Sequence, residues 1–193
     1  RVASIADPAA TAFTDTGLSI GKTYHYRVYV VNENDTYAGS NEAQATTVPL
    51  MLPVADAFNN ISIWDTLGNW GVETNGADVY LSDSPGVHYA PSLNSAHNYA
   101  LTAVNLADAT WPVLRFKDRH NFYNISSGDR GIIEVSTDGS SWIRIYGVSG
   151  VRADWTEQQI DLSRWRGQAN LRIRFYIESD GSGVGDGWHI DDV

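Results

Sequence analysis

The stretch LRIRFYIE, residues 171–178, decides the fold class of this chain. Its Leu, Ile, Phe and Ile residues alternate with Arg, Arg, Tyr and Glu, which is the two-residue period of a strand with one buried face. Similar runs recur along the chain between clusters of Gly, Asp, Asn and Ser, and no segment shows three turns of an amphipathic helix. The sequence therefore predicts an all-β protein.

A second stretch, residues 131–146, predicts a hairpin. The run GIIEVS (131–136) meets WIRIY (142–146) across Thr137-Asp-Gly-Ser140. The Asp-Gly pair supplies the positive φ that a tight turn requires. Leu114, Phe116 and Asp118 are expected to share one face of another strand.

Composition narrows the possible functions. The 193 residues include 13 Lys and Arg and 23 Asp and Glu, which gives a net charge of −10. A nucleic-acid backbone requires a basic surface, so we expect no nucleic-acid partner. The chain has no Cys, which excludes disulfides and thiolate metal sites. No apolar run reaches the roughly 18 residues of a membrane helix, so membrane insertion is not expected.

Two prolines suggest a division of the chain. Pro49 and Pro53 predict a stiff linker over residues 49–53, between a segment 1–48 and a domain 54–193. Because the chain starts at Arg1 without a signal peptide and stops at Val193 without a turn, we expect it to be part of a longer protein.

The first segment resembles half of a fibronectin type III domain. The resemblance lies in Leu18-Ser-Ile-Gly-Lys-Thr-Tyr24 and in SNEAQATTV, residues 40–48, with Gly39–Asn41 as a turn. It implies that the Tyr24 hydroxyl closes a tyrosine corner. Half a sandwich leaves a wide apolar face exposed, so this segment should be poorly stable alone.

The second segment resembles the MAM-like jelly-roll modules of secreted bacterial proteins. The motifs are ISIWDTLGNWGVE (61–73), the hairpin, GQANLRIRF (167–175) and GDGWHIDDV (185–193). Such modules occur at the C-terminus of subtilisin-like and immune-inhibitor-A-type peptidases and in cleaved adhesins. The resemblance implies a non-catalytic β-sandwich that lacks the end of its last strand here.

The same resemblance implies structural calcium. Asp191 and Asp192 are the best candidate ligands, and Asp56 and Asp83 are weaker ones. Adjacent residues on a strand face opposite sides, and the alternation from Trp188 predicts that Asp192 faces inward, where an unpaired carboxylate is costly. Calcium prefers such oxygen ligands. The alternative is that these acids bond backbone amides or arginines.

No catalytic motif is present. The sequence contains neither HExxH nor GxSxG. Asp118 and His120 could share a strand face beside Glu134, but a buried polar network explains this set better than catalysis, so we expect no enzymatic activity. Trp64 and Trp111 are the weak candidates for exposed rings on which a sugar could stack.

Three functions remain open. We expect a non-catalytic accessory or adhesion region of a secreted or cell-surface bacterial protein, most plausibly a peptidase, with other domains of its parent as partners. The first alternative is a carbohydrate-binding module that recognises a polysaccharide. The second is a structural surface or filament subunit.

Overall fold

The computed structural model divides the chain into two compact units, Arg1–Val48 and Pro49–Val193. It describes residues 10, 12–13, 15, 18, 23–31, 37–47, 50–59, 63–93, 99–123 and 128–193.

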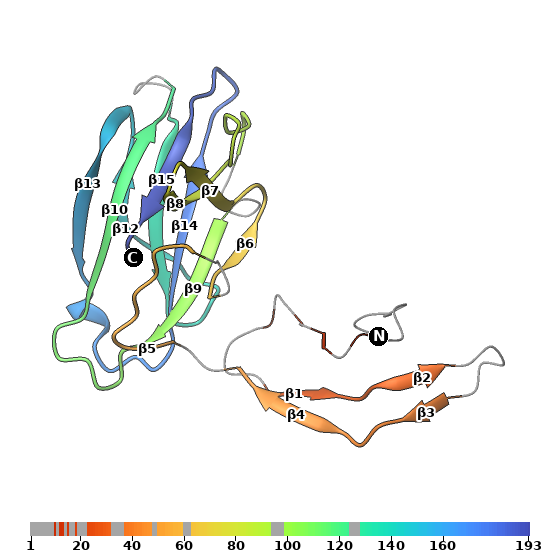
Figure 1. Ribbon diagram of the computed structural model, residues 1–193. Helices are drawn as coiled ribbons and strands as arrows, with labels where there is room; N and C mark the ends of the chain where they lie inside the picture. The colour runs from red at the N-terminus through yellow and green to blue at the C-terminus, as the bar shows by residue number, and fades with distance from the viewer. Residues whose placement is uncertain are drawn as a thin grey trace. The chain divides into compact units, whose positions relative to one another are not determined.

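The first unit contains an antiparallel ribbon of two strand pairs (Figure 1). Strand β1 (Thr23–Tyr26) pairs with β4 (Ala43–Thr46), and β2 (Tyr29–Val31) pairs with β3 (Tyr37–Gly39).

The predicted turn at Gly39–Asn41 is wrong. The Ser40 N–H donates to the Val28 carbonyl over 2.8 Å, so this segment lies within the ribbon, opposite the break between β1 and β2. Gly39 serves close packing instead, because a Cβ on it would lie 2.9 Å from the Tyr29 ring.

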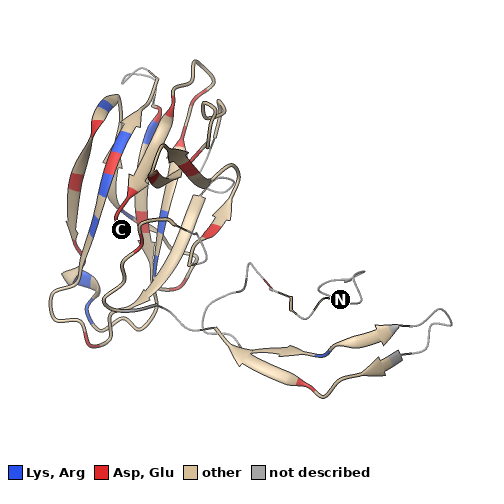
Figure 2. Cartoon of the chain, viewed as in Figure 1, with Lys and Arg blue, Asp and Glu red and all other residues tan. Residues whose placement is uncertain are grey.

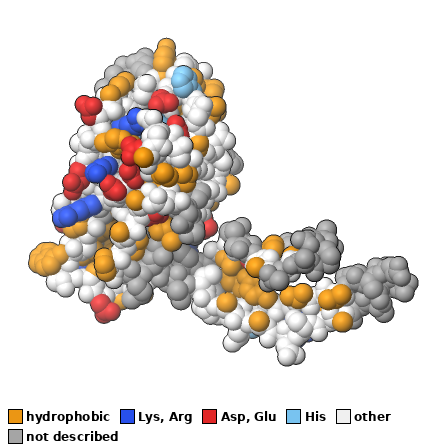
Figure 3. All heavy atoms as spheres, in the orientation of Figure 1, with side chains coloured by type: hydrophobic (Ala, Val, Ile, Leu, Met, Phe, Trp, Pro, Cys, Tyr) orange, Lys and Arg blue, Asp and Glu red, His pale blue; other side chains and the backbone are white. Residues whose placement is uncertain are grey.

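The ribbon exposes apolar side chains, and Figure 3 shows hydrophobic atoms on the surface of this unit. Val28 is 68% exposed and Val30 is 67% exposed. The Tyr26 hydroxyl donates to the Asp15 carboxylate over 2.9 Å. Residues 19–22 of the predicted tyrosine corner lie outside the described part, so the fibronectin type III assignment stays a prediction.

The second unit is a sandwich of two mainly antiparallel sheets. The five-stranded sheet has the order β13 (Val151–Asp161), β10 (Val113–Asn121), β15 (Gly187–Asp191), β8 (Asp78–Ser82), β7 (Gly71–Asn75). The six-stranded sheet follows the path β12 (Ile143–Val148), β11 (Arg130–Ser136), β14 (Leu171–Glu178), β9 (Tyr99–Asn105), β5 (Leu50–Met51), and β6 (Asp65–Leu67) also pairs with β9. A short 3₁₀ helix, η1, covers Ser163–Trp165. The prediction of an all-β jelly-roll sandwich is confirmed.

Aromatic side chains from both sheets fill the space between them. The Phe175 ring of β14 lies 5.5 Å from Trp64, 5.7 Å from Phe116 and 5.7 Å from Trp188, measured between centroids. Phe175 and Trp188 are fully buried. The apolar residues whose alternation predicted β14 are therefore the residues that face the core.

The hairpin between β11 and β12 forms where the sequence predicts it. Gly139 has a φ of 78°, which favours glycine. The backbone N–H groups of Ser141 and Ser140 donate to the Asp138 carboxylate and hold its pKa well below the usual range. This carboxylate therefore satisfies the turn's backbone donors.

The predicted linker contains a strand. Leu50 and Met51 form β5 and pair in parallel with Val104 and Asn105 of β9. The two prolines permit this because they flank the pair instead of lying within it. The second unit consequently begins before residue 54, its predicted start.

Candidate functional site

The end of β15 brings together two of the predicted calcium ligands. Asp56 and Val193 form a pair in which each backbone N–H donates to the other's carbonyl, over 2.8 and 3.0 Å. Asp56, Asn59 and Asp192 line one open hollow beside this pair. The hollow therefore gathers carboxylate and amide oxygens from the start and the end of the second unit.

The predicted inward orientation of Asp192 is wrong. Strand β15 ends at Asp191, and Asp192 has a φ of 49°, so the alternation from Trp188 does not extend to it. Its side chain is 46% exposed, and its Oδ2 lies 2.7 Å from Lys117 Nζ. The physical reason is local: a left-handed residue breaks the two-residue period of the strand.

Asp191 lies on the outer face of the sheet, opposite Lys117 of β10. Its carboxylate accepts a hydrogen bond from the Asp192 N–H over 2.8 Å. Partial burial raises its pKa. Asp56 is also engaged, because its Oδ1 accepts from Phe58 N–H and its Oδ2 from Trp64 Nε1, each over 2.8 Å.

Asp83 lies apart from this hollow, beside the start of β15. It is fully buried, and its Oδ1 accepts a hydrogen bond from the Trp188 N–H over 2.5 Å. Within the described part of the chain, its Oδ2 makes no hydrogen bond. Burial raises the pKa of Asp83 to about 7, against the opposing effect of the Trp188 hydrogen bond.

Side chains alone do not make a metal site here. Among the described residues, no three His, Asp or Glu side chains gather closely enough to hold a metal ion. An ion in the hollow beside Asp56 and Asp192 would need backbone carbonyls or water as further ligands. Asp192 would also have to leave Lys117.

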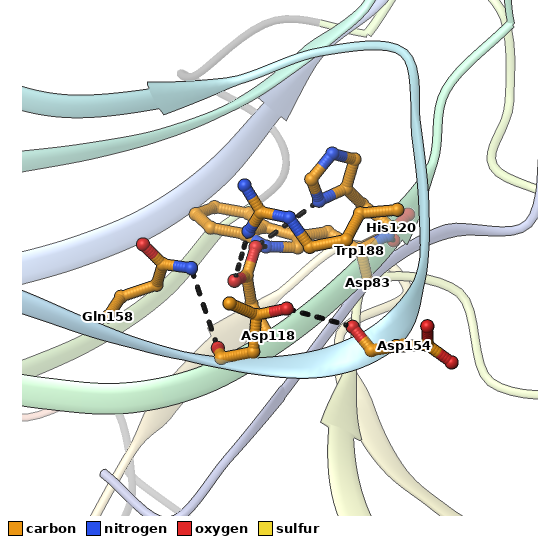
Figure 4. Close-up of polar contacts among 8 residues, drawn as sticks. Asp83, Asp118, His120, Asp154, Gln158 and Trp188 are labelled. Carbon is orange, nitrogen blue, oxygen red and sulfur yellow. Dashed lines mark hydrogen bonds and ion pairs between the residues drawn. The ribbon is translucent and has the colours of Figure 1, made fainter.

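The pair Asp118–His120 is buried in the sandwich (Figure 4). Asp118 Oδ2 lies 3.2 Å from His120 Nδ1 and accepts from Trp188 Nε1 over 3.1 Å. Asp118 Oδ1 accepts from Arg152 over 2.7 Å. His120 is 4% exposed, so a substrate in solution does not reach its ring. This network satisfies a buried carboxylate and orients the Trp188 indole.

Glu134 does not join this network. It lies on β11 in the other sheet, where its carboxylate accepts from Arg174 over 2.6 Å and from Tyr176 over 3.0 Å. The predicted neighbourhood of Glu134 and His120 is therefore wrong, since sequence periodicity does not say which strands share a sheet.

The two candidate sugar-stacking tryptophans differ in exposure. Trp64 is 6% exposed and packs between Phe58 and Phe175, so its ring is not accessible for stacking on a sugar. Trp111 is 77% exposed in the loop before β10, with the Arg166 guanidinium 5.9 Å from its ring.

A cluster of aromatic and charged side chains that the sequence did not predict lies on the outer face of the five-stranded sheet. The Arg119 guanidinium lies 5.0 Å from the Tyr80 ring and 5.1 Å from the Trp155 ring, and it donates to the Tyr80 hydroxyl over 2.9 Å. Next to Tyr80, His189 is 2% exposed, and burial lowers its pKa. The cluster joins β8, β10, β13 and β15, and no local motif predicts it. Figure 2 shows charged residues along β10 in this sheet.

No family model matches the chain. Bacillopeptidase F of Bacillus subtilis (strain 168) is 33% identical to it over 148 residues, which are 72% of this chain and 10% of that protein. The chain thus spans about a tenth of the length of this curated relative.

Several solved carbohydrate-binding modules are similar in structure. The CBM22-1–GH10 modules of Clostridium thermocellum xylanase 10B have a TM-score of 0.43 and 15% identity over 72% of this chain and 27% of that one. A CBM4 structure has a TM-score of 0.43 and 13% identity over 73% and 92% of the two chains. The family 35 module of C. thermocellum has a TM-score of 0.41 and 16% identity over 72% and 98%.

The part of the chain that the structure describes contains no helix with the length and hydrophobicity needed to cross a membrane.

Proposed function

We propose that this chain is a non-catalytic accessory region of a secreted or cell-surface bacterial peptidase. The observation that carries this proposal is the identity of 33% over 148 residues to Bacillopeptidase F. The matched segment is 10% of that protein, which leaves ample length for a catalytic domain elsewhere. In this role the region would attach the parent enzyme to a surface, hold its domains apart or dock it to a partner.

The buried polar network supports a structural role for the acid–histidine pair. A general base must reach the proton that it abstracts, within about 2.6–3.2 Å or through one water. His120 is 4% exposed and faces Asp118, whose other contacts are Arg152 and Trp188. Arg152 and Trp188 carry no nucleophile, so the pair lacks the third member of a hydrolytic site.

Two measurements test this function. The purified chain should not hydrolyse a panel of fluorogenic peptides. Bacillopeptidase F from which the matching segment is deleted should keep its turnover of a small peptide substrate. The proposal is wrong if the chain hydrolyses peptides and His120→Gln abolishes this turnover, or if the deletion variant is folded but inactive on the small substrate.

We further infer that calcium stabilises the end of β15. Asp56 and Asp192, with the Asn59 amide, provide oxygen donors of the type that calcium binds. Asp56 can remain bonded to Phe58 and Trp64, because a carboxylate oxygen accepts more than one contact. The ion would join residues from the start and the end of the second unit and would stabilise the folded state by mass action.

Carbohydrate binding is the second candidate function. Its support on this chain is Trp111, a 77% exposed indole on a loop. Sugars stack on such rings in lectin-like sandwiches. Affinity electrophoresis in gels that contain soluble xylan tests it: retardation that Trp111→Ala removes and Trp142→Ala does not would support a sugar site, and unretarded migration would exclude one for xylan.

A further inference from the structure

The outer face of the six-stranded sheet gathers arginines from three neighbouring strands. On β11 and β14, the positions that face the core are apolar, for example Ile133, Ile173 and Phe175. The alternate positions, together with one on β12, carry four arginines and two glutamates: Arg130, Arg144, Arg172, Arg174, Glu134 and Glu178. We call these six residues the arginine face.

Two of these arginines are neutralised by the glutamates. Arg174 donates to Glu134 over 2.6 Å, and their side chains are only 14% and 12% exposed. Arg130 donates to Glu178 over 2.7 Å. Both carboxylates of the face are therefore already engaged.

The other two arginines keep free guanidinium donors. Arg144 is 45% exposed, and its one ion pair in the described part of the chain is a 3.7 Å approach to Glu178, which Arg130 already binds. Arg172 forms no ion pair with any described residue, and its guanidinium packs against Gly139 in the β11–β12 turn. Because a guanidinium has five N–H donors and suits a carboxylate in a bidentate contact, each can bind an anion from solution.

The arginine face is basic although the protein is acidic. Its four arginines and two glutamates give it a net charge of +2, whereas the whole chain carries −10. Two other carboxylates lie at its margins: Asp138 bonds to backbone N–H groups of the turn, and Asp65 lies on β6, beyond β9. More distant charges are largely screened at physiological ionic strength, where the Debye length is about 8 Å. An anion placed between Arg144 and Arg172 therefore meets a positive local potential.

An aromatic ring lies among the arginines. The Arg174 guanidinium is 4.0 Å from the centroid of the Trp142 ring, a cation–π contact that covers one face of the indole. Trp142 nevertheless remains partly exposed. Arg172 is two residues from Arg174 along β14. Arg144 lies on β12 opposite Glu134, the partner of Arg174. The ring and the two free guanidinium groups therefore border one patch.

The shape of this patch and the strength of its contacts select the kind of anion. Strands β11 and β14 have strand partners on both sides, so the patch offers side chains and no free main-chain groups for an added peptide strand. An exposed ion pair changes an affinity by no more than about fivefold, so a single small anion would be held weakly. A polymer that repeats its charge along its length can rebind in many registers, which raises its effective affinity. Sugar rings in such a polymer would also find apolar contact on the indole.

We propose that the arginine face binds a linear acidic polysaccharide, a polyuronate, with a sugar ring on Trp142 and carboxylates on Arg144 and Arg172. Each carboxylate accepts a pair of N–H groups from one guanidinium. The glutamates of the face stay bonded to the other two arginines and keep them in place. This site is separate from Trp111 and does not depend on the accessory role proposed above.

Biolayer interferometry of the whole chain on immobilised polygalacturonate measures this binding. The fully methyl-esterified polymer has the same backbone without the charge, and its apparent affinity should be at least about tenfold lower. The double variant Arg144→Gln/Arg172→Gln should bind polygalacturonate about tenfold more weakly than the wild type. Trp142→Ala should weaken binding severalfold, because the sugar ring loses its apolar contact.

Control variants and a control polymer separate this site from general charge effects. Arg115→Gln/Arg164→Gln removes the same charge at exposed positions elsewhere in the second unit and should change the affinity by less than about twofold. Trp111→Ala should leave the affinity unchanged. Poly-L-glutamate, which has carboxylates but no sugar rings, should bind severalfold more weakly than polygalacturonate. Urea unfolding shows that each variant is folded under the conditions of the binding assay.

Four results would overturn the proposal. The first is equal affinity for the charged and the esterified polymer, or no binding to either. The second is an equal loss in the two double variants, which would show that only total charge matters. The third is poly-L-glutamate binding as tightly as polygalacturonate, which would make the partner an acidic peptide. The fourth is binding that Trp111→Ala removes and Trp142→Ala does not, which would leave carbohydrate binding intact as a function but place it outside the arginine face.

Discussion

The buried carboxyl of Asp83 makes stability depend on pH. Its pKa rises from 3.8 to about 7 because burial disfavours the charged form. One pKa unit corresponds to about 1.4 kcal/mol, so the shift of roughly three units has an upper limit of about 4 kcal/mol. The folded state binds the proton more tightly than the unfolded state. This contribution is therefore fully present below pH 3.8 and is lost as the pH rises to about 7.

Asp83→Asn removes this titration. The Asn amide oxygen can still accept from the Trp188 N–H, which lies 2.5 Å from Asp83 Oδ1, and the side-chain volume is almost unchanged. Between pH 5 and pH 7, wild-type Asp83 should lose about 2 kcal/mol of unfolding free energy that the variant keeps. The free energy of the variant minus that of the wild type should therefore rise by about 2 kcal/mol over this range.

Urea unfolding followed by Trp fluorescence at pH 5, 6, 7 and 8 measures the difference. Other titrating groups are common to both proteins and cancel in it when they lie far from Asp83. Asp154→Asn, at an exposed position of β13, is the control and should show a constant difference. A difference for Asp83→Asn that is also constant from pH 5 to pH 8 would refute the reasoning.

Three further predictions follow from packing, exposure and the proposed ion. Gly131→Ala should lower the unfolding free energy by about 1–3 kcal/mol, because the new Cβ would lie 2.5 Å from the Trp188 ring. Gly147→Ala is the control: its Cβ would lie 3.8 Å from the nearest atom, the Gly131 carbonyl oxygen, so the unfolding free energy should be nearly unchanged in the same urea assay. Excess calcium should raise the Tm by several degrees, and Asp192→Asn should reduce the rise; identical melts with calcium and with chelator would contradict the proposed ion. The backbone amides of residues 24–30 should exchange their hydrogens faster than those of residues 171–177, because Val28 and Val30 are about two-thirds exposed and little apolar burial stabilises the ribbon. Equal protection of the two segments in hydrogen exchange would contradict this.

Local sequence predicted the elements that depend on local chemistry. The alternation in residues 171–178 predicted β14, because a buried face demands an apolar residue at every second position. Asp138-Gly139 predicted the β11–β12 turn, because glycine accepts a positive φ and the carboxylate satisfies neighbouring N–H groups. The landmarks in residues 54–193 predicted the jelly-roll architecture as well.

Tertiary structure alone decided which segments meet and which side chains remain exposed. Trp64 and Trp111 have the same side chain, but one packs against Phe175 and the other is 77% exposed, which depends on the course of distant strands. Asp192 turned outward because one left-handed residue ended the period of β15. The parallel pairing of β5 with β9 likewise arises from long-range register. A period of two specifies the two faces of a strand, but its neighbours are chosen by contacts between residues far apart in the sequence.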